Sequence, residues 1–264
     1  MASRTKQKEQ ARARRLAEER ARAEQTRRQR RMRMIAGIML GAIAVVAVAI
    51  AVSSGGGGSG GTGLQSGSKA SATESSVNSL LSGIPQTGAV LGNPNAKVTV
   101  DYYGDLECPI CRDFTLSGGW PQLVANEVRQ GKVKVVYRAL QTATPDAQTF
   151  QTQQVAALAA GKQAKLWNYV ELFYHEQGAE GTGYVNENYL NGLAKQANLN
   201  LGTWQSDRQN PALLAQVQSD GQAGNSAGVQ GTPTLVFQGP KGKTSPSASV
   251  PTYSDLQKAI NQVS

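Results

Sequence analysis

The sequence predicts an α/β domain with a mixed sheet, preceded by one transmembrane helix. Three observations lead to this fold class. From about residue 84 onward, short β-branched runs alternate with stretches of helical periodicity. A helical block at about 146–228 separates a β-α-β half from a β-β-α half, so it is expected to be an insertion between two halves of one sheet. Residues 34–52 form an apolar run without a charge or a proline.

The N-terminal residues carry the whole net charge of the chain. Residues 1–33 hold 13 Lys/Arg and 4 Asp/Glu, which equals the net charge of +9. The apolar run at 34–52 would span about 28 Å as a helix, close to the hydrocarbon core of a bilayer. Because Arg-rich flanks stay in the cytoplasm, we expect a basic cytoplasmic tail (1–33), an uncleaved single-pass anchor (34–52) in the cell membrane, and an extracytoplasmic remainder.

This N-terminal part has alternative interpretations. Ala49-Ile50-Ala51 would suit a signal-peptide cleavage site, but the basic region and the apolar run are both longer than in a typical signal peptide. A basic tail could bind nucleic acid. Arg clusters beside a transmembrane helix, however, are what keeps that end of the helix in the cytoplasm, so we expect no nucleic-acid partner. Gly37 and Gly41 form a G-x-x-x-G pattern, yet small residues occur throughout the run, and we expect no homodimer from it.

The extracytoplasmic part divides into a linker and a domain. Residues 53–83 are rich in Gly and Ser and are expected to be a flexible linker, followed by a folded domain at 84–264. Strands are expected at 97–104, 132–140 and 231–239. Helices are expected at about 109–130, with a bend near Gly118-Gly119-Trp120-Pro121, at 186–197, 201–207 and 211–227 in the helical block, and at the C-terminus over 252–263.

Both cysteines of the chain, Cys108 and Cys111, stand three positions apart in "YGDLECPICRDF". A zinc site needs about four ligands, and the only histidine of the chain is His175. Haem attachment requires a histidine where Arg112 stands, and iron–sulfur clusters need about four thiolates. No metal site is expected, and a dithiol that opens and closes as a disulfide remains.

The position of the pair predicts a division of labour. Cys108 follows a strand and begins a helix, where unpaired N–H groups and the helix dipole stabilise a thiolate. Pro109 suits the first helical turn. We therefore expect Cys108 to be the exposed nucleophile with a low pKa, and Cys111, buried one turn later, to resolve the mixed disulfide. Pro109 and Ile110 would tune the redox potential, and because Ile110 has no donor side chain we expect an oxidant milder than the strongest of its kind.

The domain resembles the DsbA-like branch of the thioredoxin superfamily, particularly its exported bacterial members, over about residues 84–263. The resemblance rests on "LGNPNAKVTVDYYGDLECPIC", "AALAAGKQAKLWNYVELFYHEQ" and "AGVQGTPTLVFQG". It implies a thioredoxin-like fold with a helical insertion and a dithiol that works without a cofactor. It also implies that Pro233 is cis and lies beside the dithiol, and that backbone groups of Thr232 pair with an incoming peptide strand.

The sequence departs from the family at one position. Thioredoxin-like proteins often carry a buried acid six residues before the first cysteine, and here that residue is Tyr102. Asp101 is adjacent, but strand alternation directs it to the opposite face. Asp105 and Glu107 are possible proton acceptors for the second cysteine, with exposed surface acids as the alternative interpretation.

The favoured function is a membrane-anchored oxidase that donates the Cys108–Cys111 disulfide to reduced exported proteins. The resemblance implies that a membrane-bound, quinone-linked enzyme then reoxidises the pair. One alternative is an extracytoplasmic reductase or isomerase. The other is a tethered peptide-binding or assembly domain without redox turnover.

Overall fold

The computed structural model describes residues 63–244 and 250–264. The basic tail (1–33), the anchor (34–52) and the first ten residues of the expected linker lie outside the described residues. No helix within the described part of the chain is long and apolar enough to cross a membrane.

The described residues form a six-stranded mixed sheet in the order β1-β2-β4-β3-β5-β6. Its centre pairs β3 (Val98–Gly104) in parallel with β4 (Val133–Ala139) and antiparallel with β5 (Thr234–Gly239). Three two-residue strands extend the edges: β1 (Gln86–Thr87), β2 (Val90–Leu91) and β6 (Gly242–Lys243). The mixed sheet and the three main strands agree with the sequence prediction, whereas the short β1–β2 hairpin was not predicted.

Strand alternation in β3 sends side chains into two apolar clusters. Val98, Val100 and Tyr102 enter the main core, where Tyr102 is fully buried. Tyr103 enters a smaller cluster on the other face, with Leu140 as one neighbour. The β3 strand is therefore buried on both faces, as expected for the centre of a sheet that carries helices on both sides.

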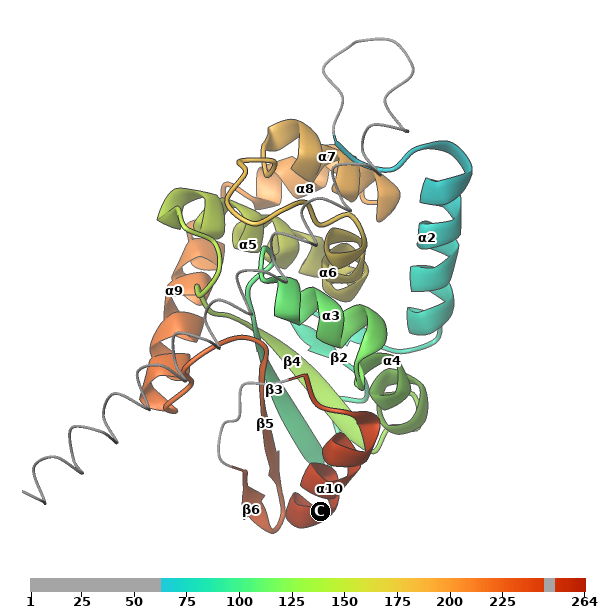
Figure 1. The fold of residues 1–264 in the computed structure, drawn as a ribbon, viewed down its shortest axis with the longest axis vertical. Coiled ribbons are helices and arrows are strands. Elements are labelled where there is room, and N and C mark those ends of the chain that lie inside the picture. The colour runs from blue at the N-terminus through green and yellow to red at the C-terminus, as the bar shows by residue number, and fades with distance from the viewer. Residues whose placement is uncertain (1–62, 245–249) are drawn as a thin grey trace, which may run out of the picture. The chain divides into compact units, whose positions relative to one another are not determined.

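Five helices between β4 and β5 make up the expected insertion, and Figure 1 shows them gathered near one end of the sheet. The helix α9 packs against β4, and α6 packs against α3 and α5. The predicted helices near 186–197, 201–207 and 211–227 agree with the observed ones to within about a residue at each end. The five are α5 (Ala147–Gly161), α6 (Leu166–His175), α7 (Glu187–Gln196), α8 (Leu201–Asp207) and α9 (Pro211–Ser226).

The helix expected over 109–130 is interrupted at Gly118 and Gly119, where the sequence predicted a bend, and its second part consists of two consecutive helical segments. The first part is α3 (Pro109–Ser117), and the second consists of α4 (Trp120–Leu123) and a π-helical turn, η1 (Val124–Val128). A Cβ at Gly118 would lie 2.8 Å from the Phe114 carbonyl oxygen, and one at Gly119 would lie 2.8 Å from the backbone of Thr252. The break follows because the chain passes so closely at Gly118 and Gly119 that only glycine fits. Thr252 caps the last helix, α10 (Tyr253–Val263).

The linker prediction is wrong over its second half, because residues 67–81 form helix α2 (Gly67–Leu81). Its Val77 and Leu81 are buried, and α2 packs against α6 (Figure 1). The side chain of Arg129 donates hydrogen bonds of 2.6 Å to the carbonyls of Leu80 and Ser82 at the end of α2. Tertiary contacts and this cap stabilise a helix whose composition alone is that of a polar linker.

Candidate active site

Cys108 occupies the N-cap position of α3, directly after the loop that leaves β3. Its sulfur accepts a hydrogen bond from the backbone N–H of Cys111 at 3.4 Å, and Pro109 stands in the first turn. Both cysteines are in the dithiol state. The sulfur therefore takes the place of the oxygen that a serine or aspartate cap would supply at this helix start.

Cys108 is 4% exposed, so the expectation of an openly exposed sulfur is wrong. The segment that includes Thr232 covers it, and the Cys108 thiol donates to the Thr232 carbonyl at 3.4 Å. The peptide bond between Thr232 and Pro233 is cis. Residues 124 positions apart in sequence thus meet at the sulfur.

The two cysteines have pKa values displaced in opposite directions. The pKa of Cys108 is lowered to about 6, chiefly by a hydrogen bond from the Cys111 thiol. Smaller contributions come from the Thr232 hydroxyl and from the backbone N–H groups of Cys111 and Ile110, whereas burial acts in the opposite direction. Burial and the neighbouring Cys108 raise the pKa of Cys111 well above its ordinary value. At pH 7 Cys108 is therefore mostly thiolate, whereas Cys111 keeps its proton.

Ile110 lies between the cysteines and is 45% exposed, while Cys111 is fully buried. Ile110 brings no side-chain donor to the sulfur. The donors that lower the pKa of Cys108 come instead from the backbone of the helix start, from Cys111 and from Thr232.

The two candidate acids, Asp105 and Glu107, are both buried, so neither is the exposed surface acid of the alternative interpretation. The Asp105 carboxylate accepts N–H hydrogen bonds from Thr142, Ala143 and Thr144 at 2.8–3.0 Å. It also accepts the Thr144 hydroxyl at 2.5 Å and the N–H of Glu107 at 3.1 Å. Asp105 therefore anchors the loop between β4 and α5.

The Glu107 carboxyl is the remaining candidate proton acceptor. Burial and the neighbouring Asp105 raise the pKa of the Glu107 carboxyl, and the Gly181 N–H partly opposes that effect. A carboxyl with a raised pKa exchanges protons closer to neutral pH than an ordinary surface acid. The assignment of Glu107 to proton transfer stays a prediction.

Tyr102 stands where related proteins have a buried acid, and its hydroxyl lies within 3.4 Å of the Thr115 hydroxyl and donates to Tyr174 at 3.5 Å. Asp101 is on the opposite face, as strand alternation predicted, and pairs with Arg138 at 2.9 Å. At position 102, hydrogen-bonded hydroxyl groups thus stand where related proteins have a carboxyl group. Asp101 does not replace that carboxyl, because it pairs with Arg138 on the other face of the sheet.

Two residues at the site were missed by the sequence prediction. The Gln177 amide donates to the carbonyls of Leu106 and Cys108 at 2.7 and 3.1 Å, and the Thr142 hydroxyl hydrogen-bonds the Thr232 hydroxyl. Both come from loops far from the cysteines in sequence, so no spacing pattern could have indicated them.

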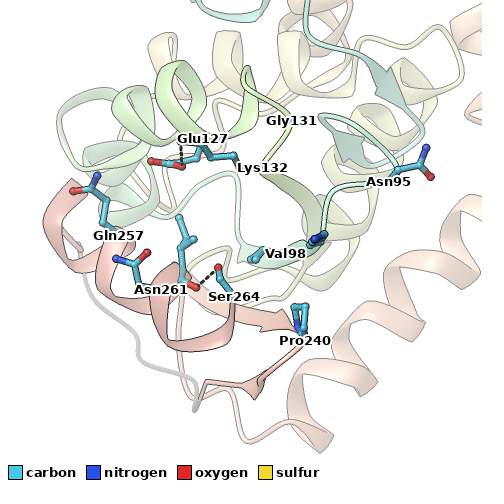
Figure 2. A pocket seen from close by; sticks show the side chains of 11 residues that line it. Asn95, Val98, Glu127, Gly131, Lys132, Pro240, Gln257, Asn261 and Ser264 are labelled. Atoms are coloured by element: carbon cyan, nitrogen blue, oxygen red, sulfur yellow. Dashed lines mark hydrogen bonds and ion pairs between the residues drawn. The ribbon is translucent and has the colours of Figure 1, made fainter.

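A cavity of about 660 Å³, lined by both polar and apolar side chains, lies away from the dithiol. In Figure 2, Glu127 lies beside Lys132, and Gln257 and Asn261 of α10 belong to the same lining. Val98, at the start of β3, also lines it, whereas Cys108 follows the other end of that strand, about 20 Å along the sheet. The dithiol chemistry therefore does not use this cavity. Within the described residues, no three His, Cys, Asp or Glu side chains gather as metal ligands would.

A reactive thiolate at a helix start, a buried protonated partner one turn away and a cis-proline loop over both define a dithiol that exchanges with disulfides. The thioredoxin family model matches residues 85–262, so the chain belongs to this family. Its DsbA-like relatives place it among the thiol–disulfide oxidoreductases.

Two curated relatives come from Bacillus. The chain is 26% identical over 166 residues to disulfide bond formation protein D of Bacillus subtilis, covering 60% of this chain and 72% of that protein. It is 22% identical over 174 residues to the probable disulfide bond formation protein D of Bacillus anthracis, covering 65% of this chain and 76% of that protein.

Solved structures share the fold. BdbD from Bacillus subtilis in its oxidised form superposes with a TM-score of 0.57 at 21% identity, covering 69% of this chain and 96% of that one. A thioredoxin-like oxidoreductase from Silicibacter pomeroyi superposes with a TM-score of 0.53 at 25% identity, covering 70% and 95%. The helical insertion is thus part of a fold that DsbA-like proteins share.

Proposed function

We propose that this oxidoreductase works as a disulfide donor to exported proteins, tethered outside the cell membrane by residues 34–52. The observation that carries the proposal is the Cys108 sulfur at the N-cap of α3, with a pKa lowered to about 6. Interactions that stabilise the thiolate stabilise the reduced form of the pair, and a stable reduced form makes the disulfide a better oxidant.

The reaction proceeds by two exchanges. A substrate thiolate attacks Cys108 in the Cys108–Cys111 disulfide, and Cys111 leaves and takes up a proton. A second substrate thiolate then attacks the substrate sulfur of the mixed disulfide and releases the Cys108 thiolate. The substrate loses two electrons and gains a disulfide, while the dithiol carries those electrons to a membrane-bound, quinone-linked enzyme that reoxidises it.

The backbone beside Pro233 offers the substrate a place to bind. Thr232 and Pro233 would pair with an extended peptide segment, so that the substrate sulfur approaches Cys108 in line. Ile110, exposed beside the sulfur, presents an apolar contact that suits an unfolded client better than a folded one.

The lack of a donor on the Ile110 side chain supports an oxidant of intermediate strength. The pKa of Cys108, about 6, lies between the values of about 3.5 in DsbA and about 7 in thioredoxin. A reductase or isomerase remains the second candidate, favoured only if the dithiol proves strongly reducing.

The test is oxidation of a reduced, unfolded protein by the oxidised full-length chain. We expect one substrate disulfide for each dithiol formed, with activity lost in Cys108→Ser. Transfer in the opposite direction only, with reduced chain cleaving substrate disulfides, would assign a reductase. Peptide binding that is unchanged in Cys108→Ser, without any exchange, would assign a binding domain.

Membrane tethering is tested separately. We expect the chain to be found in the membrane fraction. We also expect that a protease added outside the cell digests residues 63–264 and leaves the basic tail intact. Release of a soluble chain that begins after Ala51 would instead indicate cleavage of a signal peptide.

A further inference from the structure

In the loop between β4 and α5, residues 140–146, the Asp105 carboxylate anchors the backbone of residues 142–144. Asp105 accepts three successive backbone N–H groups, from Thr142 at 2.9 Å, Ala143 at 2.8 Å and Thr144 at 3.0 Å. The Thr144 hydroxyl adds a fourth bond and itself accepts the Gln153 amide at 2.7 Å. The backbone that carries Thr142 is therefore fixed relative to the loop that carries Cys108.

Thr142 reaches from this loop to the segment that covers the dithiol. Its hydroxyl hydrogen-bonds the hydroxyl of Thr232. The carbonyl of Thr232 accepts the Cys108 thiol at 3.4 Å, and the Thr232 hydroxyl is one of the groups that lower the pKa of Cys108. A line of contacts thus runs from Asp105 through Thr142 and Thr232 to the reactive sulfur.

The number of hydroxyl protons decides which threonine is the donor in the hydrogen bond between Thr142 and Thr232. A threonine hydroxyl has one proton to donate and two lone pairs that accept. If the Thr232 hydroxyl donates to the Cys108 thiolate, it has no proton left for Thr142. Thr142 must then be the donor between the two hydroxyls, and a hydroxyl that accepts such a bond is a stronger donor in turn.

We propose that Thr142 is a positioning residue whose hydroxyl donates to Thr232 and so directs the Thr232 proton at the Cys108 sulfur, with Asp105 fixing the backbone of Thr142. The proposal deepens the proposed function, on which it rests, because it acts on the same sulfur. In the oxidised pair the sulfur is a weak acceptor, so the Thr232 proton can turn to Thr142. The arrangement therefore favours the reduced form.

The experiment is the pH dependence of Cys108 alkylation by iodoacetamide in the reduced full-length chain. Only the thiolate reacts, and Cys111, with its raised pKa, does not contribute below about pH 8. We expect Thr142→Val to move the midpoint up by about 0.5 unit, whereas Thr142→Ser, which keeps the hydroxyl, stays at the wild-type midpoint. Thr142 is exposed, so its variants are expected to unfold at the wild-type denaturant concentration.

A double-mutant cycle separates positioning from a direct or structural effect. Thr232→Val should raise the midpoint by more than Thr142→Val does, and Thr142→Val should add nothing in the Thr232→Val background. An equal shift in both backgrounds would overturn the proposal, because Thr142 would then act on the sulfur without Thr232. An unchanged midpoint in Thr142→Val, or a shifted one in Thr142→Ser, would also overturn it.

The same samples distinguish this inference from the proposed function. If wild-type chain oxidises a reduced protein but the cycle shows no coupling, the role of Thr142 is wrong and the function stands. If the cycle shows coupling but wild-type chain oxidises nothing, the disulfide-donor function fails while the positioning of Thr232 by Thr142 holds.

Discussion

Cys108 and Glu171 are both buried ionisable side chains, 4% and 2% exposed, yet the protein holds them in opposite charge states near neutral pH. At the start of α3, several donors converge on the Cys108 sulfur and lower its pKa to about 6. In the core, Glu171 accepts a hydrogen bond from the Trp120 indole, and burial raises the pKa of its carboxyl to about 8.

The difference teaches that burial alone does not decide whether a group is charged. Burial opposes ionisation at both places, but only the helix start supplies enough donors to reverse it. Trp120, which faces Glu171, stacks on Trp167 at 4.8 Å between ring centroids, and aromatic surfaces offer a carboxylate little compensation. Each variant below changes either the dithiol site or the core around Glu171.

The largest effect is expected from removing the resolving thiol. In Cys111→Ala, the Cys108 thiolate can still attack a disulfide of an exported protein, forming a mixed disulfide and releasing the other substrate thiolate. No internal thiol can then displace the substrate, so mixed disulfides at Cys108 should accumulate in cells. Non-reducing gels should show adducts that disappear in the double variant Cys108→Ser/Cys111→Ala. Their absence in the single variant would contradict the assigned roles of the two cysteines.

The next effect concerns the neutral carboxyl. Unfolded Glu171 would have a pKa of about 4.3, below its folded value of about 8, so unfolding releases a proton and stability falls as pH rises between these values. Glu171→Gln keeps an oxygen for Trp120 and should remove this dependence, adding on the order of 3 kcal/mol to the free energy of unfolding at pH 7.

Denaturant titrations at several pH values measure the Glu171 effect, with Asp113→Asn as the matched control, because Asp113 is an exposed acid. Near pH 4 the Glu171→Gln variant and the wild type should converge. A variant that is equally destabilised at every pH would show that Glu171 is held as a carboxylate.

Asp105→Asn tests the charged anchor near the dithiol. An amide keeps one acceptor oxygen but turns an NH₂ group toward donors at the other position, either the N–H groups of residues 142–144 at Oδ2 or the Glu107 N–H at Oδ1. We therefore expect a loss of about 2 kcal/mol in the free energy of unfolding. Hydrogen exchange should quicken at the amides on the side that the NH₂ group faces. Unchanged protection at Glu107 as well as at residues 142–144 would contradict the anchoring role of Asp105.

The smallest effect is expected at Gln177. Gln177→Met keeps the length of the side chain but removes the donor to the carbonyls of Leu106 and Cys108, so a loss of about 1 kcal/mol is expected. Gln205→Met, which removes a hydrogen bond between exposed side chains, is the control. Equal losses in both variants would show that Gln177 contributes nothing special to the loop before α3.

The sequence predicted those parts of the fold that depend on local pattern. The three central strands and helices such as Leu201–Asp207 follow from periodicity and caps. The helix α2 was missed because its composition is polar, and packing on α6 together with the Arg129 cap stabilises it. The Gly-Gly-Trp-Pro pattern predicted the place where the helix after Cys108 is interrupted, whereas the close contacts that make the interruption complete at Gly118 and Gly119 come from the fold.

The same distinction applies to the candidate site. Cys108, Cys111 and the Thr232–Pro233 segment could be identified because short motifs carry them. Thr142 and Gln177 could not, because folding brings them to the dithiol from distant loops. Asp105 and Glu107 were named together as candidate acids, and only their different hydrogen-bond partners separate an anchor from a candidate proton acceptor.

The most direct test of a Cys108–Cys111 pair poised for disulfide donation is its redox potential, measured in the full-length chain by equilibration with glutathione. A Cys108 pKa of about 6 predicts a potential between about −270 mV, the thioredoxin value, and about −120 mV, the DsbA value. A potential at or below about −270 mV would contradict the account, because the dithiol would then reduce its clients rather than oxidise them.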